Sequence, residues 1–149
     1  MILISHRGNL SGVNTDMENH PEYIETAIRS SYNCEVDLWS VNNELFLGHD
    51  SPQHKVKIDF LMNFKKSLWI HCENLQSLEY LIETNLGFTF FWHQTDDYTL
   101  TSNGFIWTYP GKITGAKSIL VHLNEPDFTK NDFNKKIAGI CSDYVTKFS

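Results

Sequence analysis

The sequence predicts an α/β fold built on a mostly parallel sheet. Short apolar runs recur along the chain, amphipathic segments separate the first of them, and 41% of the 149 residues are hydrophobic. Strands that alternate with helices are typical of a parallel sheet with right-handed crossovers. This length and hydrophobic content are enough for a continuous core, so we expect residues 1–149 to form a single domain.

The alternation is clearest in the first 92 residues. The helix that begins at Pro21 is the best signalled, because Asn19 and Glu22 have the spacing of a capping box. Hydrophobic periodicity places the other elements. The expected order is strand 2–5, helix 21–31, strand 34–39, helix 58–65, strand 68–72, helix 75–84, strand 88–92, and then strands 105–108, 118–122 and 138–141 with a helix near 129–136.

The strand over 34–39 carries two acidic side chains on one face. Alternation turns Glu35 and Asp37 away from the apolar residues of the same strand, which can pack against helices. Two carboxylates that share a buried face repel each other, and a hard divalent cation such as Mg²⁺ or Ca²⁺ offsets that cost. The alternative is an exposed edge strand with two solvated acids.

Histidines follow two of the apolar runs. His6 and Arg7 come directly after the run 2–5, and His49 follows the run 45–47 and a glycine. Parallel α/β folds build their sites at the carboxyl ends of strands. A lone histidine is more often structural, but beside the acid pair both histidines become catalytic candidates.

Short motifs follow one another over residues 2–50: His6-Arg7-Gly8, Glu18-Asn19, Glu35-Val36-Asp37 and Gly48-His49-Asp50. In this order and with these gaps they resemble the N-terminal signature of the glycerophosphodiester phosphodiesterases, a family of the phosphatidylinositol-phospholipase-C-like barrel superfamily. The resemblance is close over this segment and loose over the remainder of the chain.

The resemblance implies a metal held by Glu35 and Asp37, with Glu18 completing or orienting the ligand shell. The family pattern continues with Glu-x-Lys on a later strand, and this chain departs from it by placing His71 and Glu73 there. We expect Glu73 to be the later ligand for Mg²⁺ or Ca²⁺, and His71 to contact phosphate or a metal-bound water. An imidazole ligand would instead favour Mn²⁺ or Zn²⁺.

The resemblance also implies phosphate contact from Arg7 and general acid and base roles for His6 and His49. Cleavage of a phosphodiester needs charge neutralisation on the phosphoryl oxygens, a base for the attacking hydroxyl and an acid for the leaving alkoxide. The expected activity is hydrolysis of a glycerophosphodiester or a related small sugar-phosphate diester. Two alternatives stay open: a lyase of the same barrel type that releases a cyclic phosphate, and a catalytically weakened binding module.

Other candidates stand in the second half of the chain. His93 follows an aromatic run, and parallel strands would bring it to the same rim as His6. Trp107 is a candidate for lining a substrate pocket, with a place in the core as the alternative. Asp143 ends the last apolar run and is a weaker candidate for the same rim.

Length limits the barrel that the resemblance implies, because a complete eight-unit barrel needs about 200–250 residues. We therefore expect a compact, trimmed TIM-type (β/α) barrel with about seven or eight mostly parallel strands. Missing helices would leave apolar strand faces uncovered, so loops or a second subunit of a homodimer must cover them.

The net charge of −6 argues against an extended basic surface for nucleic acid. No apolar run has the length of a membrane span, and no signal peptide is visible. Cys34, Cys72 and Cys141 fall within expected strands. We therefore expect them to be buried, reduced thiols of a cytoplasmic protein. The expected partner is a small-molecule phosphodiester.

Overall fold

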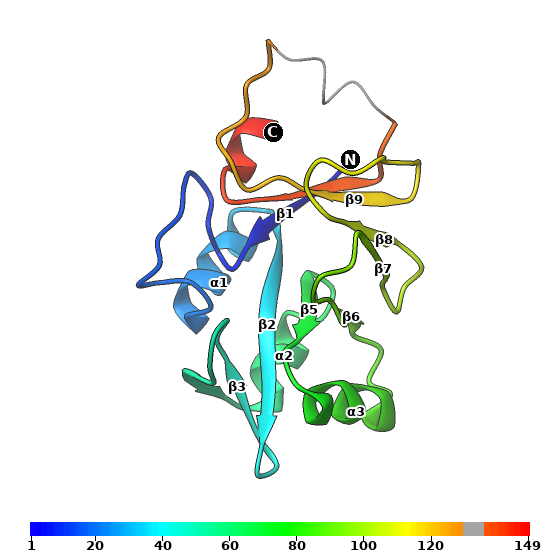
Figure 1. Ribbon diagram of the computed structural model, residues 1–149. Helices are drawn as coiled ribbons and strands as arrows, with labels where there is room; N and C mark the ends of the chain where they lie inside the picture. Colours follow the sequence, from blue (N-terminus) through cyan, green and yellow to red (C-terminus); the bar gives the residue numbers. More distant parts are fainter. Residues whose placement is uncertain (130–135) are drawn as a thin grey trace.

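The computed structural model describes residues 1–129 and 136–149. These residues form ten strands of one mixed sheet, three α-helices and a C-terminal 3₁₀ helix (Figure 1). The strands are β1 (Ile2–His6), β2 (Asn33–Val41), β3 (Glu44–Leu47), β4 (His54–Val56), β5 (Leu68–Cys72), β6 (Thr89–Phe91), β7 (Tyr98–Leu100), β8 (Ile106–Thr108), β9 (Ser118–Val121) and β10 (Gly139–Ser142). The helices are α1 (Pro21–Arg29), α2 (Ile58–Asn63), α3 (Leu75–Thr84) and the 3₁₀ helix η2 (Val145–Phe148).

The long strand β2 organises the sheet. Its first half pairs in parallel with β1, its second half pairs antiparallel with β3, and β5 runs parallel along its other edge. Parallel pairing continues from β5 to β6, and from β1 through β10 and β9 to β8. The antiparallel strands β3, β4 and β7 extend this parallel set at its edges.

The predicted trimmed TIM-type barrel is wrong. The sheet is a mixed, strongly curled half-barrel, and its strand pairing does not close between β6 and β7. The three α-helices of the described residues all precede β6, so the repeating strand–helix unit stops there. The connections 92–97, 101–105 and 109–117 contain only turns and irregular chain, and they leave no room for crossover helices.

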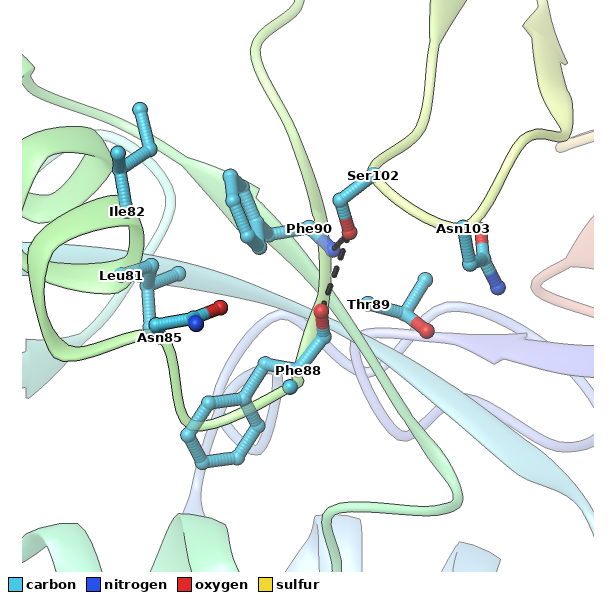
Figure 2. A pocket seen from close by; sticks show the side chains of 9 residues that line it. Leu81, Ile82, Asn85, Phe88, Thr89, Phe90, Ser102 and Asn103 are labelled. Carbon is cyan, nitrogen blue, oxygen red and sulfur yellow. Dashed lines mark hydrogen bonds between the residues drawn. The ribbon is translucent and has the colours of Figure 1, made fainter.

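The open edge of β6, here called the seam, contacts the β7–β8 turn rather than another strand. Ser102 holds this turn, because Phe90 N donates to its Oγ at 2.9 Å and that hydroxyl donates to the Phe88 carbonyl at 3.1 Å (Figure 2). A hollow of about 410 Å³ lies here, between the end of α3 and the seam. Its lining includes Leu81, Ile82, Asn85, Phe88, Thr89, Phe90, Ser102 and Asn103.

The two faces of β2 have opposite roles, as its alternation predicts. Cys34, Val36 and Leu38 are fully buried in an apolar cluster that includes residues of all three α-helices. A second cluster lies on the other face and contains the large rings of Trp69 and Trp107. Glu35 and Asp37 therefore point away from the helices, towards the inside of the curl.

Several local predictions need correction or stay untested. Asn19 is not the N-cap of α1; His20 has that place, and its Nδ1 accepts from Glu22 N at 3.3 Å. The helix expected near 129–136 lies outside the described residues except for its two ends. Leu100 and Ile113 are 72% and 83% exposed, and the homodimer that would cover such residues stays a prediction.

The three cysteines are buried and free, as expected of reduced thiols. Among the described residues, no helix has both the length and the apolar character that crossing a bilayer requires.

Candidate functional site

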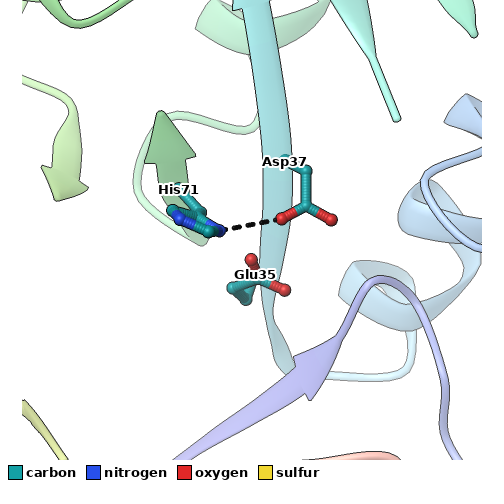
Figure 3. Close-up of side chains that lie close together, drawn as sticks. All are labelled: Glu35, Asp37 and His71. Carbon is teal, nitrogen blue, oxygen red and sulfur yellow. Dashed lines mark hydrogen bonds and ion pairs between the residues drawn. The ribbon is translucent and has the colours of Figure 1, made fainter. Parts of the chain in front are cut away.

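The acid pair of β2 lies among the carboxyl ends of its parallel neighbours. His6 of β1 is in register with Glu35, and His71 of β5 is in register with Asp37. Residues opposite each other on adjacent strands have neighbouring side chains, so the pairing itself assembles the group. Figure 3 shows Glu35, Asp37 and His71 turned towards one another.

Asp37 is the centre of the site and is fully buried. Its Oδ2 accepts from Asn19 Nδ2 at 2.7 Å and pairs with Arg7 Nε at 2.9 Å, while Oδ1 lies 3.0 Å from His71 Nδ1. Burial by itself raises the pKa of Asp37, but contacts with His49, His71 and Arg7 outweigh burial and hold that pKa well below its ordinary value. Asp37 is therefore a carboxylate at neutral pH.

Glu35 has the opposite character. It is 2% exposed, and its Oε2 has no hydrogen-bond partner; the nearest histidine nitrogen, His6 Nε2, is 3.9 Å away. Burial and then the charge of Asp37 raise the pKa of Glu35 well above its ordinary value. A buried carboxyl group in this setting either keeps its proton or needs a cation beside it.

His6 is oriented by Asp143, which follows directly after β10. His6 Nδ1 lies 2.8 Å from Asp143 Oδ1, and the same oxygen accepts from Asn9 Nδ2 at 2.8 Å. A carboxylate oxygen only accepts, so Nδ1 carries the hydrogen and Nε2 keeps its lone pair on the side of Glu35. Asn9 was not a candidate from the sequence, because an asparagine in a loop shows no pattern that marks it.

Arg7 connects the two ends of the site. Its guanidinium contacts Asp37 at 2.9 Å, Glu18 Oε2 at 3.3 Å and His49 Nδ1 at 2.8 Å. The backbone at Arg7 is left-handed, with φ of 54°, and the following Gly8 has φ of 94°. A Cβ at Gly8 would lie 2.6 Å from Tyr23 Cδ1, so the turn that presents Arg7 requires a glycine.

His49 is the most accessible member of the site, with a side chain that is 44% exposed. Neutral His49 accepts at Nδ1 from Arg7. Nδ1 also lies 3.5 Å from both Asp37 Oδ2 and Glu73 Oε1, and these contacts become ion pairs when His49 is protonated. The contact with Asp37 outweighs partial burial and raises the pKa of His49.

His71 and Glu73 lie beside Asp37, as strand alternation predicts. His71 Nδ1 is 3.2 Å from Glu73 Oε1, its Nε2 is 2.8 Å from the His93 carbonyl, and its ring stacks on Phe91. Burial and the charge of Asp37 raise the pKa of Glu73 to about 7, although the His71 charge opposes them. Both side chains thus reach the site.

The remaining candidates lie further from the acid pair. The His93 ring is 6.3 Å from that of His71, and burial followed by the charge of His71 lowers the pKa of His93. Trp107 belongs to the apolar cluster inside the curl, where its ring stacks on Phe91 at 4.5 Å. Glu18 contacts Arg7 and Asn9 and thereby orients the site.

The residues present fit a divalent cation. Within the described chain there are two overlapping groups of three residues, and in each group the three potential ligand atoms lie within 4.8 Å of one another. One group is Glu35, Asp37 and His71, and the other is Asp37, His49 and Glu73. Carboxylate oxygens with one imidazole nitrogen form a common donor set for such ions. The unpartnered buried Oε2 of Glu35 is the atom that a cation would satisfy.

A polar hollow of about 240 Å³ opens beside this group. It is lined by Arg7, Thr15, Glu18, Asn19, His49, Asp50 and Gln53. Because Arg7, Glu18 and His49 of the site line this hollow, it is the candidate substrate site.

The chain matches no protein-family model, no curated protein and no solved structure. The chemistry of these side chains is therefore the guide to function. An acid pair can hold a cation, an oriented imidazole can move a proton, and a guanidinium beside a small polar hollow can bind an anionic group.

Proposed function

We propose that this chain is a metal-dependent phosphodiester hydrolase acting on a glycerophosphodiester or a related small sugar-phosphate diester. The observation that carries the proposal is the convergence of Arg7, the oriented His6 and the buried acid pair at neighbouring strand ends. Each group supplies a different requirement of phosphodiester cleavage.

Arg7 supplies phosphate binding. Burial lowers the pKa of its guanidinium, but the charges of Asp37, Glu35 and Glu18 outweigh burial and raise it, so Arg7 stays cationic. Its contacts with Asp37 and Glu18 fix its direction beside the polar hollow. A planar guanidinium that is held in place recognises phosphoryl oxygens with little further loss of side-chain entropy.

His6 and His49 supply the proton transfers. His6 Nε2 has a free lone pair because Asp143 holds the hydrogen on Nδ1, so His6 takes the proton from the attacking water. His49 has a raised pKa and is accessible from the hollow, so it donates a proton to the departing alkoxide. Hydrolysis breaks the phosphorus–oxygen bond to one alcohol and leaves a phosphomonoester.

Glu35 and Asp37 would hold the divalent cation, with His71 or Glu73 as the later ligand. The cation supplies Lewis-acid withdrawal of charge from the phosphoryl oxygens. Asp37 has a further effect, since its direct contact orders the guanidinium of Arg7.

The size and polarity of the hollow support a small headgroup diester as substrate. About 240 Å³ is too little for acyl chains, and its described lining is polar or charged. A binding module without turnover is the second candidate. The loss of the family's lysine at Glu73 and the three contacts of Arg7 favour that alternative.

A screen of diesters tests the proposal. Glycerophosphocholine, glycerophosphoethanolamine and bis-p-nitrophenyl phosphate would be incubated with purified protein and Mg²⁺, Ca²⁺, Mn²⁺ or Zn²⁺ in turn, and the products identified by ³¹P NMR. A phosphomonoester is the expected product. A cyclic phosphate would instead indicate the lyase, and binding of diesters without turnover would indicate the module.

A further inference from the structure

His71 indicates which kind of metal ion the site selects. Its Nε2 lies 2.8 Å from the main-chain carbonyl of His93. A carbonyl oxygen only accepts hydrogen bonds, so Nε2 carries the hydrogen of the neutral imidazole. The lone pair of His71 is then on Nδ1.

That lone pair faces two carboxylates. Nδ1 lies 3.0 Å from Asp37 Oδ1, which as the oxygen of an ionised carboxylate has no hydrogen to donate, and 3.2 Å from Glu73 Oε1. Three electron-rich atoms at such distances repel one another unless a proton or a metal cation lies between them. In the metal-free protein a proton on Nδ1 fills that role, and a bound cation would take its place. The stack on Phe91, with ring planes 4° apart, holds the imidazole in this direction.

A second, independent feature points to the same place. Glu35 is 2% exposed, its Oε2 has no hydrogen-bond partner, and its ligand atom lies within 4.8 Å of those of Asp37 and His71 (Figure 3). The three donors come from β2 and β5, which are in register at Asp37 and His71. They are therefore positioned by strand pairing rather than by a loop.

We propose that Nδ1 of His71 is a direct ligand of the metal ion, and that the site consequently prefers Mn²⁺ or Zn²⁺ to Mg²⁺ or Ca²⁺. This inference rests on the metal site of the proposed function, but it is independent of turnover. Mg²⁺ and Ca²⁺ take oxygen ligands, whereas an imidazole nitrogen favours first-row transition ions. It reverses the roles expected from the sequence for His71 and Glu73.

Binding measurements on metal-free protein test the preference. Calorimetric titration should show wild-type protein binding Mn²⁺ at least about 10-fold more tightly than Mg²⁺, and His71→Gln should weaken Mn²⁺ binding by about 100-fold or more. His71→Glu should reverse the preference in favour of Mg²⁺. His54→Gln is the matched control, because His54 of β4 contacts His20, with ring centroids 5.0 Å apart, and lies in neither ligand group.

A spectroscopic readout identifies the ligand directly. The electron spin-echo spectrum of the Mn²⁺-loaded wild type should contain coupling to a bound ¹⁴N, which His71→Glu should abolish and His54→Gln should retain. If a variant fails to fold, the wild-type spectrum still tests the inference, because absence of nitrogen coupling would exclude His71 as a ligand; coupling that survives in His71→Glu would point to His49 of the second ligand group instead.

The outcomes separate this inference from the function. Mn²⁺ binding without nitrogen coupling, coupling that persists in His71→Glu, or equal affinity for Mg²⁺ and Mn²⁺ would overturn the ligand role of His71 and leave the metal site intact. Absence of binding for every divalent ion would overturn the metal site and the proposed hydrolase together.

Discussion

Replacing Glu35 by Gln should change how the stability of the metal-free protein depends on pH. Glu35 is 2% exposed, and burial and the charge of Asp37 raise its pKa well above the ordinary value of 4.5. Glutamine has nearly the same shape and no charge. The variant therefore removes the cost of ionising this group while it preserves the packing around β2.

The sign of the effect follows from proton linkage. Because the folded pKa of Glu35 exceeds the unfolded one, its stabilising contribution is complete below the unfolded pKa and is lost as pH rises through the folded pKa. Stability should fall by up to about 1.4 kcal/mol per pH unit for this proton. Glu73 acts in the same direction, since burial raises its pKa to about 7. Asp37, with its lowered pKa, contributes only below its ordinary value of 3.8.

Between about pH 4.5 and 6.5 the difference between wild type and Glu35→Gln reports on Glu35. Burial lowers the pKa of His54 and of His93, so these two histidines raise stability as pH rises through the window, but they do so in both proteins. His49 and His71 also have raised pKa values, but they reduce stability only above their ordinary value of 6.5. Urea unfolding in the presence of a chelator should show a shallower decline for Glu35→Gln than for wild type across this window. Glu79→Gln, on the exposed face of α3, is the control and should follow the wild type. Equal slopes for wild type and Glu35→Gln would refute the reasoning that Glu35 is a buried, unpaired acid.

Other variants separate catalytic, conformational and packing roles. His6→Gln should lower kcat by about 10²–10⁴-fold with unchanged metal affinity. Asp143→Asn should shift the pH–rate profile, and an unaltered profile would show that Asp143 does not position His6. Gly8→Ala should destabilise the protein by about 1–3 kcal/mol in urea unfolding, since its Cβ would meet Tyr23, and wild-type stability would contradict that contact. Trp107→Ala should cost about 3–5 kcal/mol of stability. A rise in KM at full stability would instead place Trp107 in the substrate site.

Alternation in β2 and β5 was enough to predict the inner face of the site. Glu35, Asp37, His71 and Glu73 point to one side because side chains in a strand alternate, and that rule needs no knowledge of the partner strands. The apolar residues of β2 pack against the helices for the same reason. These parts of the site depend only on local geometry.

The edges of the sheet could not be predicted in the same way. Strands β6 and β8 lie within the strands expected at 88–92 and 105–108, but β4 and β7 were not expected, because three residues each are too few for a period of two to stand out. The antiparallel β7–β8 pair replaces a crossover, and nothing in a short run of residues shows its direction. The expected barrel was wrong because its closure depends on these later strands.

Asn19 shows the limit of capping signals. Its spacing to Glu22 indicates a helix start, yet its backbone has φ of 62° and its side chain bonds Asp37 at both ends, through Nδ2 at 2.7 Å and Oδ1 at 2.9 Å. A contact between residues 18 positions apart carries no local signature. The same holds for Asn9, which links Asp143 and Glu18.

The most direct test of the proposed activity is the rate of diester hydrolysis by wild-type protein, measured after chelation and again after a divalent ion is restored. His6→Gln and His54→Gln serve as the matched pair. Hydrolysis should cease with the chelator, return with the ion, and survive in His54→Gln but not in His6→Gln. Turnover that is indifferent to the chelator, or equal in the two variants, would contradict a metal-dependent hydrolase built on Glu35, Asp37 and His6.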